Sequence, residues 1–166
     1  MFLASSFKNF KFIKERLGYH PTEELLLDAP FDYPSQALLY VPRDLPEPGS
    51  EAGPYVEKLS DRCKELIMAS GGKTFILFTS YALLNQIYEK LDDLSLPFPL
   101  IRQGDLPTTL MIDKFKEKPS VIFGTNSFWQ GVDIPGKALQ SVIITKLPFD
   151  VPKEPLTEAR IEELKS

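Results

Sequence analysis

Short, almost wholly apolar runs recur along this sequence and constrain its fold more than any other feature. The clear runs cover residues 37–41, 75–78, 121–123 and 142–144, and a weaker candidate covers residues 99–102. Runs without polar alternation suit strands that are covered on both faces, as in a parallel sheet. We therefore expect these runs to be the strands of one open sheet.

Stretches with the apolar spacing of a helix lie before and between these runs. Their inward-facing residues are expected to be Phe7, Phe10, Ile13 and Leu17; Val56, Leu59, Cys63, Leu66 and Ile67; Leu84, Ile87, Leu91 and Leu94; and Leu110, Met111 and Phe115. Alternating strands and helices predict an open sheet with right-handed crossovers. The expected fold class is a three-layer α/β domain with a mainly parallel central sheet.

The composition limits the kinds of partner that the chain can have. Its 166 residues suffice for one domain with a sizeable core. The net charge of −4 argues against a broad basic surface for nucleic acid, so any DNA must be held by a few local groups. No apolar run approaches the roughly 18 residues that span a bilayer, and the start lacks a signal-peptide core. We expect a cytoplasmic protein without a membrane partner.

Three features that suggest chemistry have simpler structural explanations. The sequence Gly71-Gly72-Lys73-Thr74 resembles the end of a phosphate-binding P-loop, but Ile67 stands where that motif needs a glycine, and the sequence leads into a strand instead of a helix. A helix that ends at Gly71 or Gly72 explains it better. The single cysteine, Cys63, lies on an apolar stripe and is expected in the core, and His20 has no partner at metal-binding spacing. We expect no metal site.

Polar residues follow two of the predicted strands. Thr79 and Ser80 come after the run at 75–78, and Ser80 is a good helix N-cap candidate, at a junction whose free N–H groups favour phosphate. The stretch 124–136 follows another run and carries Asp133. Each loop alone is equally well explained as an ordinary capped turn. In a parallel sheet both emerge at the same end, where they can share one extended ligand.

The stretch 124–136, Gly-Thr-Asn-Ser-Phe-Trp-Gln-Gly-Val-Asp-Ile-Pro-Gly, resembles motif V of superfamily 2 DNA helicases of the DinG/XPD type. Residues 146–149, followed by 151–152 and 154–156, resemble the segment that follows motif V. Residues 75–81 resemble motif IV, and residues 10–18 with 31–33 resemble the stretch after motif III. The resemblance therefore runs in order over nearly the whole chain. Gln130 departs from the family, which commonly has glutamate there, and this leaves the role of that position open.

The resemblance implies a second RecA-like (P-loop NTPase-like) motor domain of an ATP-dependent helicase in DNA repair or replication. The single domain would cover 1–166, with a lead-in over 1–30 and an α/β core over 36–166. Its partners would be single-stranded DNA and the first RecA-like domain of the same polypeptide, with ATP and Mg²⁺ bound in the cleft between the domains. The implied DNA-binding residues are Thr79, Ser80, Gln103, Gly104, Gly124, Thr125 and Asn126, and the implied ATP-cleft residues are Gly131 and Asp133. For Trp129, stacking on a base and anchoring the motif V loop are both open.

Several helicase motifs are absent from the sequence. It has no Walker A loop and no Asp-Glu-x-His box, so we expect no catalytic residue here, and we expect the arginine-bearing motif VI to follow Ser166. The intact protein would hydrolyse ATP, and this chain alone would not. Two alternatives stay open: a phosphate- or small-molecule-binding α/β module, and a degenerate helicase-like domain that serves protein interaction.

Overall fold

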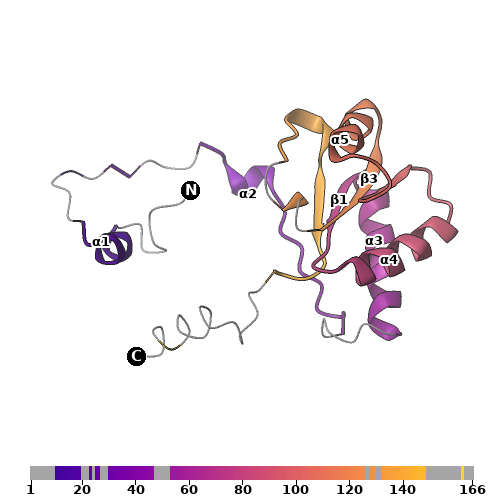
Figure 1. Ribbon diagram of the computed structural model, residues 1–166, viewed down its shortest axis with the longest axis horizontal. Helices are drawn as coiled ribbons and strands as arrows, with labels where there is room; N and C mark the ends of the chain where they lie inside the picture. The colour runs from indigo at the N-terminus through magenta and orange to yellow at the C-terminus, as the bar shows by residue number, and fades with distance from the viewer. Residues whose placement is uncertain are drawn as a thin grey trace. The chain divides into compact units, whose positions relative to one another are not determined.

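The computed structural model describes residues 10–19, 23, 25–26, 30–46, 53–125, 128–129, 132–148 and 162. The chain divides into two compact units, residues 1–42 and 43–166. The first unit contains the helix α1 (Lys11–Leu17), which ends at Gly18 in a left-handed conformation, and the short helix α2 (Tyr33–Gln36) (Figure 1). Leu17 is 68% exposed, so its predicted inward position in the first helix was wrong.

The strand expected over residues 37–41 is not formed, and that prediction was wrong. The segment pairs with no strand, and Leu38 and Leu39 are 92% and 87% exposed. A strand requires a neighbouring strand to accept and donate its backbone hydrogen bonds. The described residues of the first unit contain no other strand, so an apolar run alone was an insufficient signal here.

The second unit is built around a sheet of four strands with helices between them (Figure 1). Its elements are, in chain order, α3 (Pro54–Ala69), β1 (Lys73–Leu77), α4 (Tyr81–Asp93), β2 (Leu100–Arg102), α5 (Thr108–Glu117), β3 (Ser120–Gly124), the 3₁₀ helix η2 (Gly136–Ala138) and β4 (Ser141–Ile144). The strand order is β2-β3-β1-β4, and every pair is parallel. The four strands expected in this part of the sequence are confirmed.

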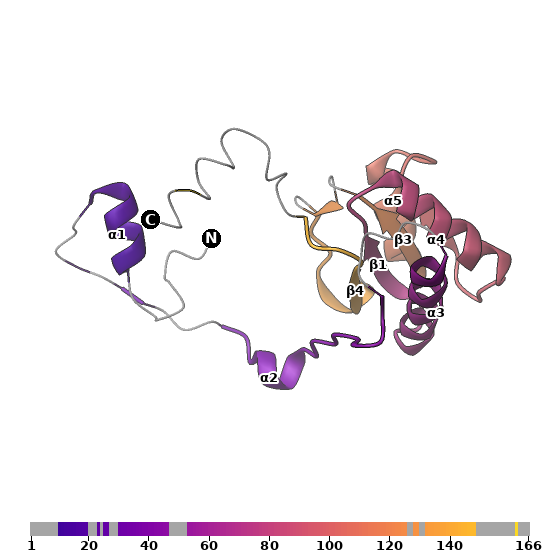
Figure 2. The same cartoon turned by 90° about the horizontal axis from the view of Figure 1, so that it is seen from below.

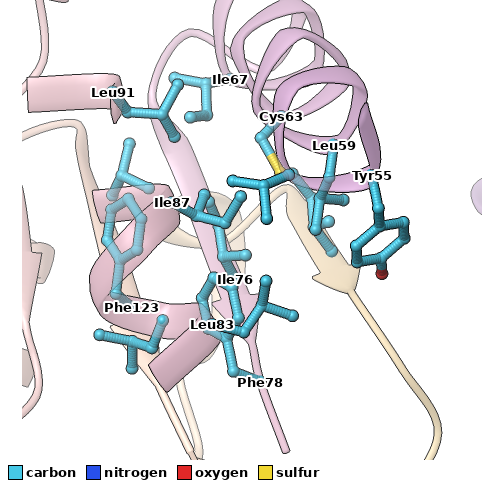
Figure 3. Close-up of a cluster of buried hydrophobic side chains, with 14 residues drawn as sticks. Tyr55, Leu59, Cys63, Ile67, Ile76, Phe78, Leu83, Ile87, Leu91 and Phe123 are labelled. Carbon is cyan, nitrogen blue, oxygen red and sulfur yellow. The ribbon is translucent and has the colours of Figure 1, made fainter. Parts of the chain in front are cut away.

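Helices cover both faces of the sheet, which confirms the three-layer prediction. The helices α3 and α4 lie side by side and pack on one face (Figure 2), where their apolar stripes meet alternate side chains of the strands, such as Ile76 and Phe123 (Figure 3). On the other face, Met111 and Phe115 of α5 pack against Phe75 and its neighbours. Strand residues alternate between the two faces, so a parallel sheet with both faces covered needs apolar residues at nearly every position.

Most predicted helix residues face the core, and the exceptions lie near helix ends. Leu94 is 46% exposed because α4 has already ended at Asp93, and Leu110 is 50% exposed in the first turn of α5. Leu83, which the pattern did not select, is buried against the sheet. Among the described helices, none has the length and apolar character that crossing a bilayer requires.

The two adjacent glycines end α3 instead of forming a phosphate loop. Gly72 donates its N–H to the Ile67 carbonyl at 2.9 Å, Gly71 donates to the Met68 carbonyl at 3.2 Å, and both have positive φ angles. This pair of bonds is the Schellman arrangement of a helix C-terminus. Gly72 is also covered by the ring of Phe98, which leaves no room for a Cβ atom. The prediction of a helix end is confirmed.

Candidate functional site

The residues that follow the four strands lie together at one end of the sheet, because parallel strands all end on the same side. The register pairs the strand ends directly, with Leu77 of β1 beside Gly124 of β3 and beside Ile144 of β4. We call this end the carboxyl rim; it comprises Thr79 and Ser80 after β1, Gln103 and Gly104 after β2, Thr125 after β3, and Thr145 after β4. Ser80 and Thr125 therefore follow neighbouring strands on the same rim, as the sequence predicted.

Ser80 is the N-cap of α4. Its backbone is extended, and its hydroxyl accepts a hydrogen bond from the Leu83 N–H at 3.3 Å, which confirms the predicted cap. Thr79 and Ser80 are both half-buried. The cap satisfies one of the free N–H groups that begin a helix, and the positive end of the helix dipole stays directed at the rim.

Gln103 and Thr125 are joined across the rim by two hydrogen bonds to one oxygen. The Gln103 Oε1 accepts from the Thr125 N–H at 2.6 Å and from the Thr125 hydroxyl at 3.1 Å. Gln103 is itself fixed by its backbone N–H, which donates to the Phe123 carbonyl at 2.9 Å. Thr125 is only 4% exposed. The turn after β2 and the turn after β3 thus form one connected unit.

The turn that carries Gln103 and Gly104 is braced by charged and aromatic side chains. The Arg102 guanidinium donates to the Asp105 carboxylate from Nη2 at 3.0 Å and from Nε at 3.2 Å, and the hydrogen bond with Asp105 raises the pKa of Arg102. The same guanidinium lies over the Tyr88 ring, 4.7 Å from its centroid. Arg102 stays charged, but the Asp105 carboxylate offsets its charge, so the pair adds no net positive charge to the rim.

The start of the loop after β3 is held by close packing. Gly124 has an ordinary backbone conformation, but an added Cβ would lie 2.7 Å from the Phe128 ring, so only glycine fits. The Phe128 ring packs edge-on against the Phe75 ring, and the two ring centroids lie 6.1 Å apart. The Trp129 Nε1 donates to the Phe78 carbonyl at 3.3 Å. Of the two roles open for Trp129, these contacts favour the loop anchor.

Two rim residues were missed by the sequence reasoning. The Thr145 hydroxyl donates to the Leu77 carbonyl at 3.0 Å, and the Tyr55 hydroxyl donates to the Thr145 carbonyl at 3.1 Å. Thr145 had a detectable signal, since it follows a predicted strand just as Thr125 does. Tyr55 had none, because it reaches the rim from α3, 90 positions away in the sequence. Together they bind β4, β1 and α3 to one another.

The proposed ATP-cleft residues are only partly described. Asp133 is exposed, between Val132 and Ile134, which pack against the core on the α5 face. Asn126 and Gly131 lie outside the described residues.

Thr79, Ser80 and Gln103 of the rim are half-buried and Gly104 is exposed, whereas Thr125 and Thr145 are buried. Two cavities, of about 290 and 500 Å³, lie along β2 and α5 and between α3 and α4, and neither is lined by Thr79, Ser80, Gln103 or Thr125. Within the described residues no group of three or more histidine, cysteine, aspartate or glutamate side chains is arranged to hold a metal ion. The half-buried or exposed polar residues of the rim and the N-terminus of α4 are groups that suit an anionic ligand.

Comparison with known proteins matches residues 63–166 to the family described as helicase C-terminal domain. The chain is 39% identical over 155 residues to an ATP-dependent DNA helicase YoaA from Haemophilus influenzae, covering 93% of this chain and 24% of that protein. It is 38% identical over 141 residues to the ATP-dependent helicase DinG from Mycobacterium tuberculosis, covering 84% and 21%. A probable ATP-dependent helicase YpvA from Bacillus subtilis is 32% identical over 154 residues, covering 92% and 22%. The chain spans less than a quarter of the length of these relatives.

Proposed function

Because the chain belongs to the helicase C-terminal domain family, we propose that its carboxyl rim binds the backbone of single-stranded DNA within an ATP-dependent helicase of the DinG type. The binding surface would comprise Thr79, Ser80, Gln103, Gly104, Gly124, Thr125 and Asn126. Gly131 and Asp133 would lie toward ATP and Mg²⁺ held mainly by a first RecA-like domain of the same polypeptide.

One observation carries this proposal: the loops after β1 and β3 are neighbours at the same end of a parallel sheet. Each loop brings small polar residues, and β1 is followed by the N-terminus of a 13-residue helix. Backbone N–H groups, hydroxyls and helix N-termini are the groups that contact nucleic-acid phosphates without reading sequence. Spaced along one rim, they match the repeating phosphates of a strand.

Substitution of Ser80 by aspartate tests the DNA-binding surface. Asp caps a helix about as well as Ser, so α4 and the free energy of unfolding should be retained. The new carboxylate would repel a phosphate at this position. In a fluorescence anisotropy titration with a labelled single-stranded oligothymidylate at low salt, we expect Ser80→Asp to weaken binding at least about fivefold, a change of roughly 1 kcal/mol.

Ser95→Asp is the matched control. Ser95 follows α4, at the opposite end of the sheet from the rim, and its left-handed backbone is one that aspartate tolerates. This variant carries the same change in net charge and should bind the oligonucleotide within about twofold of the unaltered chain. Equal affinities for the two variants would overturn the assignment of DNA to the rim. Tight binding of inorganic phosphate without any binding of DNA would favour a phosphate-binding module.

The role of Asp133 requires a protein of the relatives' full length. There we expect Asp133→Asn to lower DNA-stimulated ATP turnover, because an exposed carboxylate would be lost from the interdomain cleft. Binding of single-stranded DNA in the absence of ATP should be retained, because Asp133 is not among the proposed DNA contacts. Unchanged ATP turnover in the Asp133→Asn variant would contradict the proposed place of this carboxylate in the cleft.

A further inference from the structure

We infer that Gln103 is a positioning residue: its side-chain carbonyl holds Thr125 and thereby sets the path of the loop that follows β3. The purpose of that loop rests on the proposed function, but the positioning itself does not. One oxygen accepts both hydrogens that Thr125 offers, at 2.6 Å from its backbone nitrogen and 3.1 Å from its hydroxyl. An oxygen with two lone pairs can satisfy both donors at once.

The backbone of the turn that carries Gln103 is held in place by its neighbours. Its backbone extends the pairing of β2 with β3 by donating to the Phe123 carbonyl, and it forms a further isolated bridge with Leu106. The preceding Arg102 is bound to Asp105 and lies over Tyr88. The Gln103 side chain therefore reaches Thr125 from a turn that is itself constrained on both sides.

Thr125 in turn determines where the loop begins. Its carbonyl accepts the Phe128 N–H at 2.8 Å, which closes a turn, and Phe128 packs over Gly124. Trp129 then donates from its ring nitrogen to the Phe78 carbonyl at the end of β1. Through these contacts the Gln103 oxygen is connected to both loops of the rim.

The geometry argues against direct contact between DNA and this oxygen. A carbonyl oxygen cannot donate a hydrogen bond to a phosphate oxygen, and here it already accepts two. Thr125, which donates to it, is almost fully buried. The Gln103 carbonyl oxygen therefore acts on a ligand through the loop that it holds, and the side-chain NH₂ group is the part of Gln103 that the proposed binding surface would use.

Trp129 gives a direct readout, because it is the single tryptophan of the chain and belongs to this loop. In Gln103→Met the side chain keeps its length but loses the acceptor, so Trp129 emission should shift to longer wavelength and acrylamide quenching should rise. Gln103→Glu keeps an oxygen acceptor at the same place and should retain the emission of the unaltered chain. Gln140→Met, at the amino end of β4, is the matched control and should change neither property.

Affinity for a labelled oligothymidylate provides the second readout. Gln103→Met should weaken binding about three- to tenfold, the range expected for one or two lost hydrogen bonds. Thr125→Val removes the hydroxyl, and the double variant should bind no more weakly than Gln103→Met alone, because both changes break the same connection. Additive losses would overturn the inference and indicate a separate contact by Gln103.

The outcomes separate this inference from the proposed function. Unchanged Trp129 emission and quenching in Gln103→Met overturn the positioning role, whatever the DNA result. If the chain binds no DNA but Trp129 emission shifts in Gln103→Met and not in Gln103→Glu or Gln140→Met, the proposed function is overturned and the positioning role is supported. If Gln103→Met does not fold by circular dichroism, Gln103→Asn takes its place: it keeps the amide but is too short to reach Thr125, and it should give the same red shift.

Discussion

Cys63 shows how far burial determines the chemistry of a residue. It is fully buried on α3 between the helix and the sheet (Figure 3), and burial raises the pKa of its thiol to about 12 from an ordinary value of 9.0. The thiolate is the reactive form of cysteine, so this residue is inert in the folded chain. Its prediction as a core residue, made from its place on the apolar stripe, is confirmed.

The shift in the Cys63 pKa predicts a loss of stability at alkaline pH. The folded state favours the protonated thiol, so its contribution is complete below pH 9.0 and is lost as the pH rises toward about 12. We expect the free energy of unfolding in urea to fall over this range. A Cys63→Ala variant, destabilised by about 1–2 kcal/mol at neutral pH, should show a shallower fall. Identical slopes for the two chains would contradict the assignment.

Gly124→Ala should destabilise the chain by about 1–3 kcal/mol, the usual cost of overpacking. The added methyl group would lie 2.7 Å from the Phe128 ring, and Phe75 limits the movement of that ring. Urea denaturation measures the effect. A second change, Phe128→Leu, should recover part of the loss in the double variant, because it removes the ring that the methyl group meets. A Gly124→Ala chain as stable as the original would show that the ring can move.

At the scale of the element, helix ends were predicted better than the extent of each apolar face. Gly71 and Gly72 marked the end of α3, and Ser80 marked the start of α4, because caps depend on residues next to one another in the chain. Leu94 and Leu110 fitted the helical spacing but are exposed. Spacing alone does not show where along a helix the contact with the sheet stops.

The end of α3 yields a test of backbone conformation alone. Gly71 has a φ of +62°, and a Cβ there would meet no atom within 4 Å. Gly71→Ala should therefore cost about 1 kcal/mol from the left-handed conformation, and Gly71→Asn should cost less, because asparagine tolerates that region. Thermal or urea unfolding of the two variants gives the comparison. If the Gly71→Ala and Gly71→Asn variants have the same free energy of unfolding, Gly71 does not have a left-handed backbone in solution.

At the scale of the whole molecule, charge limits affinity for DNA. The net charge is −4, Arg102 is neutralised by Asp105, and Lys146 is an exposed cation beside Thr145 in the described part of the rim. We expect the chain alone to bind single-stranded DNA with a Kd of about 10⁻⁴–10⁻⁶ M and a slope of about −0.7 in log K against log salt for each neutralised phosphate. Anisotropy titrations at several salt concentrations measure both. A tight complex with DNA whose affinity does not change with salt concentration would contradict the proposed binding surface.

The chain alone is also expected to lack ATPase activity. Its sequence contains neither a Walker A loop nor an Asp-Glu-x-His box, the two motifs that we expect to hold Mg²⁺ for phosphoryl transfer. A phosphate-release assay on the purified chain, with and without single-stranded DNA, should give only background turnover. Turnover that Asp133→Ala abolishes would contradict this expectation, because it would place a complete active site within these 166 residues.

The sequence alone determined the α/β class, the four parallel strands of the second unit and the family. These follow from local patterns: apolar runs fit covered strands, caps lie beside the residues that they cap, and the stretch 124–136 lies within residues 63–166, which match the family. Locality also explains the failure at residues 37–41. Whether an apolar run becomes a strand depends on a partner that the run does not encode.

Only the tertiary structure decided which side chains meet at the rim. Gln103 and Thr125 are 22 positions apart, Trp129 and Phe78 are 51 apart, and Tyr55 and Thr145 are 90 apart. Sequence spacing carries no information about such pairs, because each depends on which elements the fold places side by side; the strand order β2-β3-β1-β4 places β1 beside both β3 and β4, for example. The residue types at the strand ends were readable in the sequence, and their pairing was fixed by the register of the sheet.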